Sequence, residues 1–139
     1  MVTINYLSGK AFEVKVRDHV LICDQPLKSD GQDRGPAPAE FFGASLGACI
    51  GYYAMSYLEA RSLPTEGLQV HTSWEGTDKP KRIASIKTRI VLPDGVPEVN
   101  HDRILRACQR CLIHNTLHEP PEVSVEIDTG DVETTTTHE

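Results

Sequence analysis

The sequence has few of the features that would assign a chain to a class at once. Only four of its 139 residues are cysteine, too few for a small secreted scaffold held by disulfides. Basic residues are also in the minority, with 14 Lys and Arg against 20 Asp and Glu and a formal net charge of −6. Nucleic acids and anionic membranes are bound mainly through basic patches, so neither is expected as a general partner.

Several sequence signals are missing as well. The chain has no glycine-rich phosphate loop, no serine nucleophile elbow and no HExxH metal motif. Residues 1–10 lack the basic segment and apolar run of a secretion signal, which together with the few cysteines predicts a cytoplasmic protein. The stretch from Phe41 to Leu58 carries no charge and is about long enough to cross a bilayer. Because it is rich in Gly, Ala, Ser and Tyr, we interpret it as a buried helix.

The chain does have the composition of one globular domain, 39% hydrophobic and 24% charged. We expect this domain to span residues 1–128, and the polar, threonine-rich residues 129–139 to form a disordered tail. The order of predicted elements is too irregular for a doubly wound parallel sheet, so we expect an α+β fold with antiparallel strands and helices packed on them. The predicted strands are 2–7, 11–17, 20–23, 68–74, 82–92 and 123–127, and the predicted helices are 39–61 and one that begins near residue 98 and includes Cys108, Cys111 and Asn115.

Three glycines lie four residues apart on the first predicted helix, at Gly43, Gly47 and Gly51. Each glycine weakens a helix by about 1 kcal/mol relative to alanine. Three in register therefore predict a groove for another backbone, either a second helix or a copy of the same one.

Cys49 and Cys111 stand on the apolar faces of the two predicted helices. A buried free cysteine usually acts as a small hydrophobic residue, and that interpretation stays open for each of them. If the helices pack together, the two thiols could face each other. Such a pair can reduce a peroxide: one thiolate attacks the O–O bond and becomes a sulfenic acid, and the other thiol resolves it as a disulfide.

Cys108 and Cys111 also form a C-x-x-C pair, which His114 extends. It has three interpretations: a dithiol redox motif, a zinc site completed by Cys23 or His71, and plain core packing of Cys108. Core packing is favoured, because a dithiol motif normally opens a helix and this one falls late in its predicted helix.

Charged residues near these motifs could tune a thiolate. Arg17, Arg34 and Arg110 are the candidate cations, although each also fits an ordinary surface charge. Glu40 lies too far along the helix to touch Cys49. We expect the helix dipole to stabilise its carboxylate at the start of the helix. The alternative role is to orient an arginine side chain.

Residues 35–49, GPAPAEFFGASLGAC, resemble the first cysteine motif of the osmotically inducible protein C and organic hydroperoxide resistance (OsmC/Ohr) family. There a Gly-x-x-Pro-x-Glu segment leads into a helix of small residues that ends in Ala-Cys. Residues 111–117, CLIHNTL, are similar to its second motif, and the strands predicted between the motifs lie where the family has its middle strands. The resemblance covers nearly the whole of residues 1–128.

The resemblance implies an OsmC-like α+β fold with antiparallel sheets, two long central helices and an intertwined homodimer whose active sites lie at the subunit interface. It implies a peroxidase that reduces organic hydroperoxides to alcohols, with Cys49 as the peroxidatic thiol and Cys111 as the resolving thiol. By the same resemblance Glu40 would hold an activating arginine, Arg17 or Arg34. A dithiol, such as one of the lipoyl type, would be the reductant. No cofactor or metal is expected.

Two positions depart from the peroxidase branches of the family. Ala39 occupies the position where those branches carry the carboxylate, and Leu112 occupies the position of a proline that commonly follows the second cysteine. These differences place the chain nearer the OsmC-like branch. They also support an alternative function, a catalytically weak protein that binds a small apolar ligand at the dimer interface.

Overall fold

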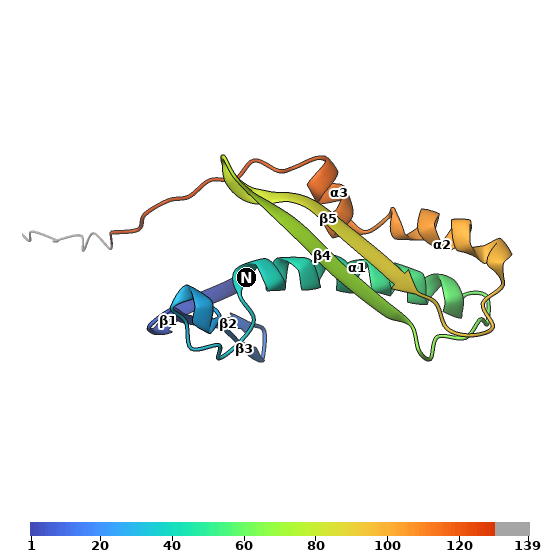
Figure 1. The fold of residues 1–139 in the computed structure, drawn as a ribbon, viewed down its shortest axis with the longest axis horizontal. Helices are drawn as coiled ribbons and strands as arrows, with labels where there is room; N and C mark the ends of the chain where they lie inside the picture. Colours follow the sequence, from blue (N-terminus) through green and yellow to red (C-terminus); the bar gives the residue numbers. More distant parts are fainter. Residues whose placement is uncertain (130–139) are drawn as a thin grey trace, which may run out of the picture.

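The structure, a computed structural model, describes residues 1–129. An antiparallel sheet of three strands comes first, followed by one long helix, an antiparallel pair of strands and two short helices (Figure 1). The elements are β1 (Val2–Ser8), β2 (Ala11–Val16), β3 (His19–Cys23), α1 (Pro38–Glu59), β4 (Gln69–Asp78), β5 (Lys81–Val91), α2 (His101–Cys108) and α3 (Leu112–His118), with short 3₁₀ turns at Leu27–Ser29 and Glu98–Asn100.

The long helix organises most of the chain. The β4–β5 pair packs against α1, and α2 and α3 contact α1 as well (Figure 1). The β1–β2–β3 sheet lies beside the start of α1, apart from β4 and β5. The expected α+β class with antiparallel sheets is confirmed. Within residues 1–129, α1 is the one long helix, so two long central helices are not present in the described part of the chain.

Both ends of α1 follow from local sequence. Pro38 occupies the first helical position, where its missing N–H has no helical partner to lose. Ala37 offers no polar side chain, but its backbone N–H donates to the Glu40 carboxylate at 2.7 Å, so Glu40 closes the first turn. At the other end, Ser62 is left-handed (φ 54°) and the Leu63 N–H donates to the Leu58 carbonyl, which satisfies the last turn.

The glycine ridge, made of Gly43, Gly47 and Gly51, packs against a strand of its own chain, so the prediction of a second helix of this chain in that groove is wrong. The alternative, a copy of the same helix, stays a prediction. A Cβ atom at Gly43 would lie 2.7 Å from Cζ3 of Trp74, and one at Gly47 would lie 2.8 Å from Oγ1 of Thr72. Both contacts are with β4. The bulky tryptophan ring sits directly on the helix backbone, and only glycine leaves room for it.

The prediction of one continuous second helix is also wrong, because the chain breaks between Cys108 and Leu112. The Cys111 N–H donates to the Cys108 carbonyl at 3.1 Å in a tight turn, and Cys111 itself has an extended ψ of 125°. Its sulfur accepts the His114 N–H at 3.3 Å and so caps α3. Apolar spacing continues across the break, which is why periodicity alone indicated one helix.

Residues 123–127 do not form the predicted last strand. Val123, Val125 and Ile127 are almost fully exposed, and within residues 1–129 no strand lies beside them to supply ladder hydrogen bonds. The tail predicted at 129–139 falls outside the described residues except for Thr129. Within the described part of the chain, no helix has the length and apolar character needed to cross a membrane.

The core lies between α1 and the two short helices, and one buried hydrogen bond crosses it. The Tyr57 hydroxyl donates to Oδ1 of Asn100 at 2.9 Å. Tyr57→Phe should lower the free energy of unfolding by about 1–3 kcal/mol, because it leaves the Asn100 oxygen buried without this donor. Urea denaturation measures the change, with Tyr52→Phe as the control because Tyr52 is 60% exposed. Equal midpoints for the two variants would contradict the prediction.

Candidate active site

Two cysteines distant in sequence meet at the centre of the molecule. Cys49 lies midway along α1, and Cys111 lies at the N-cap of α3. Their side chains are in hydrogen-bonding contact. Cys111 is completely buried, whereas Cys49 is half-buried.

The surroundings of Cys49 favour its thiolate. Burial raises the pKa of the Cys49 thiol, but the Cys111 thiol and the backbone N–H groups of Ile113 and Leu112 lower it by more, leaving the pKa below its ordinary value. These N–H groups are in the first turn of α3, where they have no helical acceptor. The break before α3 therefore provides the donors that stabilise the sulfur.

The other three thiols are held in the protonated form. Burial and the neighbouring Cys49 raise the pKa of Cys111. Burial, with Cys111 close by, raises the pKa of Cys108 to about 11, and burial beside Asp24 raises that of Cys23. Of the four cysteines, only Cys49 has a pKa that is shifted toward the nucleophilic thiolate.

This asymmetry predicts a pH dependence for alkylation. The rate at which iodoacetamide modifies Cys49 should rise through a midpoint below that of an ordinary thiol, because its pKa is lowered and its thiolate is populated at lower pH. Cys23 should show a higher midpoint. Quantifying each modified peptide by mass spectrometry across pH 5–10 measures both midpoints. In urea, which unfolds the protein, the difference between the two midpoints should vanish. A Cys49 midpoint equal to that of Cys23 in the folded protein would contradict the prediction.

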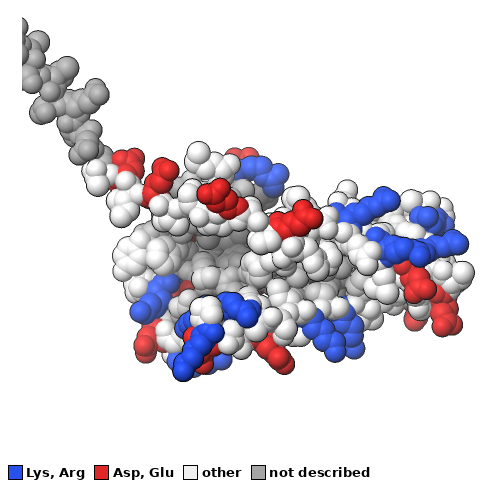
Figure 2. All heavy atoms as spheres, turned by 90° about the horizontal axis from the view of Figure 1, so that it is seen from above, with Lys and Arg blue, Asp and Glu red and all other residues white. Residues whose placement is uncertain are grey.

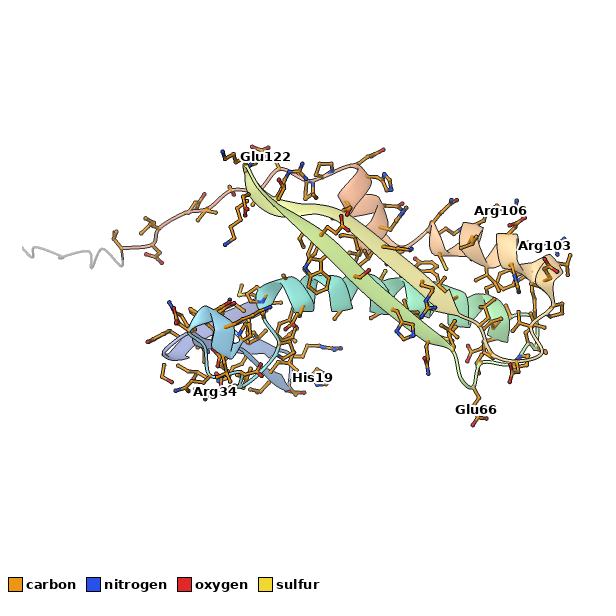
Figure 3. All side chains as sticks on the ribbon, in the orientation of Figure 1. His19, Arg34, Glu66, Arg103, Arg106 and Glu122 are labelled. Atoms are coloured by element: carbon orange, nitrogen blue, oxygen red, sulfur yellow. The ribbon has the colours of Figure 1, made fainter. Side chains whose placement is uncertain are left out.

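The predicted charged partners are not brought to the thiols within one chain. Glu40 caps the first turn of α1, about 13 Å along the helix axis from Cys49 at 1.5 Å per residue. Arg17 occupies the turn between β2 and β3. Nη1 of Arg34 donates to the Ser8 hydroxyl at 3.1 Å, and Figure 3 shows Arg34 beside the N-terminal sheet. In residues 1–129, no Lys or Arg is among the groups that lower the pKa of Cys49.

The C-x-x-C motif is packed into the core. The Cys108 thiol donates to the Ile50 carbonyl at 3.7 Å and lies in the same apolar cluster as Cys111. Among the described residues, no group of three or more His, Cys, Asp or Glu side chains is placed to hold a metal ion. The zinc interpretation therefore has no support in the geometry.

Two grooves flank α1; the glycines of the first were predicted from the sequence to line a groove, whereas the second was not evident from the sequence. One has a volume of about 430 Å³ and lies between α1 and β4, along the glycine ridge. The other, of about 610 Å³, lies between α1 and α2 and is lined by tyrosines and by Arg61, Arg103, Arg106 and Arg110. Figures 2 and 3 show basic side chains gathered at this end of the molecule, where Arg103 and Arg106 project from α2.

Sequence analysis also missed the backbone donors of Leu112 and Ile113. Side-chain chemistry gives no signal for them, since any residue has an N–H group and only a helix start leaves it free. They became identifiable once the break after Cys108 was known.

Comparison with known proteins places this arrangement in a family. Residues 31–126 match the family described as OsmC-like protein. No curated protein matches the sequence. Among solved structures, the chain is similar to an OsmC-like protein from Mycoplasma pneumoniae, with 17% identity, coverage of 85% of this chain and 86% of that one, and a TM-score of 0.74.

Two further solved structures are organic hydroperoxide resistance proteins. The one from Elizabethkingia anophelis is 17% identical, with coverage of 86% of this chain and 89% of that one and a TM-score of 0.65. The one from Legionella pneumophila is 15% identical, with coverage of 84% and 88% and a TM-score of 0.59. At these identities the likeness shows the fold, whereas the family match covers more than half of the chain and includes both cysteines of the site. The chain therefore belongs to the OsmC-like protein family.

Proposed function

We propose that the protein is a cytoplasmic thiol-dependent peroxidase that reduces organic hydroperoxides to alcohols, with Cys49 as the attacking thiol and Cys111 as the resolving thiol. The observation that carries the proposal is the contact between these two thiols together with the unequal tuning of their pKa values. Family membership and the relatives that are organic hydroperoxide resistance proteins support it.

The chemistry balances over three steps. The Cys49 thiolate attacks the distal oxygen of the hydroperoxide, the O–O bond breaks, and the departing alkoxide takes a proton to become the alcohol. The Cys111 thiol then attacks the Cys49 sulfenic sulfur, which releases water and forms a disulfide. A dithiol reductant restores both thiols by exchange and leaves as its own disulfide.

Backbone hydrogen bonds would assist both halves of this cycle. The N–H groups of Leu112 and Ile113 stabilise negative charge on the Cys49 sulfur before attack. They also favour Cys49 as the leaving thiolate when the disulfide is reduced, since a thiol of lower pKa leaves faster. Cys111 is already in contact with the sulfur that it would resolve.

We further propose that the active form is a homodimer. Every residue of β1 is exposed, including Ile4 and Tyr6, and the tip of the β2–β3 hairpin exposes Val20 and Leu21. A second copy that covers this sheet would bury apolar surface that one chain leaves in water. Because Arg17 and Arg34 belong to this part of the chain, a second copy is also the way either arginine could reach Cys49. Sedimentation equilibrium should give twice the chain mass of 15.4 kDa, and a monomer would refute the dimer.

Rapid-quench peptide mapping tests the peroxidase proposal. The reduced protein is mixed with one equivalent of cumene hydroperoxide, quenched with acid within seconds and mapped without reduction. We expect cumyl alcohol and a disulfide between Cys49 and Cys111, with Cys23 and Cys108 still free. Free thiols throughout in a folded protein would refute the proposal.

The groove along the glycine ridge favours one alternative. It is lined mainly by small and apolar residues of α1 and β4, so a catalytically weak protein could hold a small apolar ligand there, beside a second copy. Native mass spectrometry that detects a co-purified apolar molecule, without alcohol production from hydroperoxide, would select this alternative.

A further inference from the structure

A third cysteine adjoins the proposed thiol pair and has no part in the two-cysteine cycle. Cys108 is 7% exposed and belongs to the same core cluster as Cys111, which is 0% exposed. The two are separated by only Gln109 and Arg110. The structure therefore places three thiols at one core cluster, with Cys111 interacting with both half-buried Cys49 and Cys108.

The backbone between Cys108 and Cys111 fits a disulfide. The Cys111 N–H donates to the Cys108 carbonyl at 3.1 Å, closing a turn of four residues. The Cα atoms across such a turn are within about 7 Å, close to the roughly 4.4–6.8 Å that a disulfide requires. The two sulfurs also interact electrostatically. The turn therefore brings the two residues near the separation at which a disulfide can form.

We propose that Cys108 and Cys111 form a second, interior dithiol that takes over the disulfide from Cys49. This inference rests on the proposed function for its oxidant, the organic hydroperoxide. In the exchange, the Cys108 sulfur attacks the Cys111 sulfur of the disulfide between Cys49 and Cys111. The bond from Cys111 to Cys49 breaks, the Cys108 proton ends on Cys49, and a disulfide between Cys108 and Cys111 remains.

The surroundings of the three sulfurs give this exchange its direction. Cys49 is the best leaving group of the three because N–H groups of α3 stabilise its thiolate. The Cys108 thiol is mostly protonated, but its fixed position beside Cys111 gives it a high effective concentration. The new disulfide is buried, whereas the regenerated Cys49 thiol is open to a second hydroperoxide. Reduction would proceed in reverse, through Cys49.

Time-resolved mapping tests the exchange. Trypsin cuts after Arg34, Arg61, Arg106 and Arg110, so the three cysteines fall in separate peptides, 35–61, 107–110 and 111–139. After one equivalent of cumene hydroperoxide, we expect the early link between peptides 35–61 and 111–139 to be replaced by a link between 107–110 and 111–139. Cys49 should then become free to react with N-ethylmaleimide. A persistent link from Cys49 to Cys111, with Cys108 free, would overturn the proposal.

Stoichiometry gives a second readout. The protein is treated with excess hydroperoxide in the presence of dimedone and without a reductant. The wild type should then consume two equivalents of hydroperoxide per chain and carry a dimedone adduct on Cys49. Cys108→Ser should stop at one equivalent without the adduct, and Cys23→Ser should behave as wild type. Circular dichroism checks the fold of each variant. One equivalent for wild type would count against the exchange.

Diamide, which oxidises dithiols directly, separates this proposal from the proposed function. Cys49→Ser treated with diamide should form the disulfide between Cys108 and Cys111. If this disulfide forms but hydroperoxide oxidises no thiol in wild type, the peroxidase proposal fails and the interior dithiol stands. If neither oxidant joins Cys108 to Cys111, the interior dithiol is refuted.

Discussion

Cys49→Ser should reduce hydroperoxide consumption to the uncatalysed background, a loss of roughly 1000-fold or more because the nucleophile is removed. Serine is nearly the same size as cysteine, and its hydroxyl is not ionised at neutral pH. The other three thiols cannot replace Cys49, since their pKa values are all raised. The measurement is the decay of cumene hydroperoxide with dithiothreitol as reductant.

Cys23→Ser is the matched control for this result. Cys23 lies in β3, is half-buried, and has a thiol whose pKa burial raises. Its replacement should leave the rate unchanged within the error of the assay. Substantial consumption by Cys49→Ser would show that another thiol attacks, and would remove Cys49 from the proposed role.

Cys111→Ser should keep the first turnover, but its Cys49 should no longer be protected from further oxidation. Without a resolving thiol, the sulfenic acid on Cys49 persists and a second equivalent of hydroperoxide converts it to the sulfinic acid, so consumption should end after roughly two equivalents. Mass spectrometry of peptide 35–61 would show a dimedone adduct early and a two-oxygen addition later. Continued turnover without sulfinic acid would contradict a resolving role for Cys111.

Cys111→Ala distinguishes resolution from activation. The Cys111 thiol donates a hydrogen bond that lowers the pKa of Cys49, and a serine hydroxyl can replace that donor whereas alanine cannot. Both variants should lose resolution, but Cys111→Ala should also slow the first turnover at pH 7. Raising the pH should restore it, because the Cys49 thiolate then forms without the donor. Equal first-turnover rates at pH 7 would show that the contact does not activate Cys49.

Much of the fold followed from local sequence. The β-branched and aromatic residues on either side of the turn at Gly9 predicted β1 and β2, because strands favour such residues. The apolar repeat between Pro38 and Pro64 predicted α1, because a helical repeat marks the face that is buried. The strands of the β4–β5 pair were also predicted, each with a boundary error of up to a few residues. The missing last strand has another cause: ladder hydrogen bonds need a neighbouring strand, and residues 123–127 have none in the described chain.

The sequence by itself determined which residues are the candidates for chemistry: the two motif cysteines and the C-x-x-C pair, with Glu40 as a carboxylate at the start of α1. Tertiary structure decided how they relate. The break after Cys108 makes Cys111 a helix cap and brings it, with two backbone N–H groups, to the Cys49 sulfur. Periodicity cannot report this, because a pKa depends on neighbours in space, and those neighbours are set by packing between segments far apart in the chain.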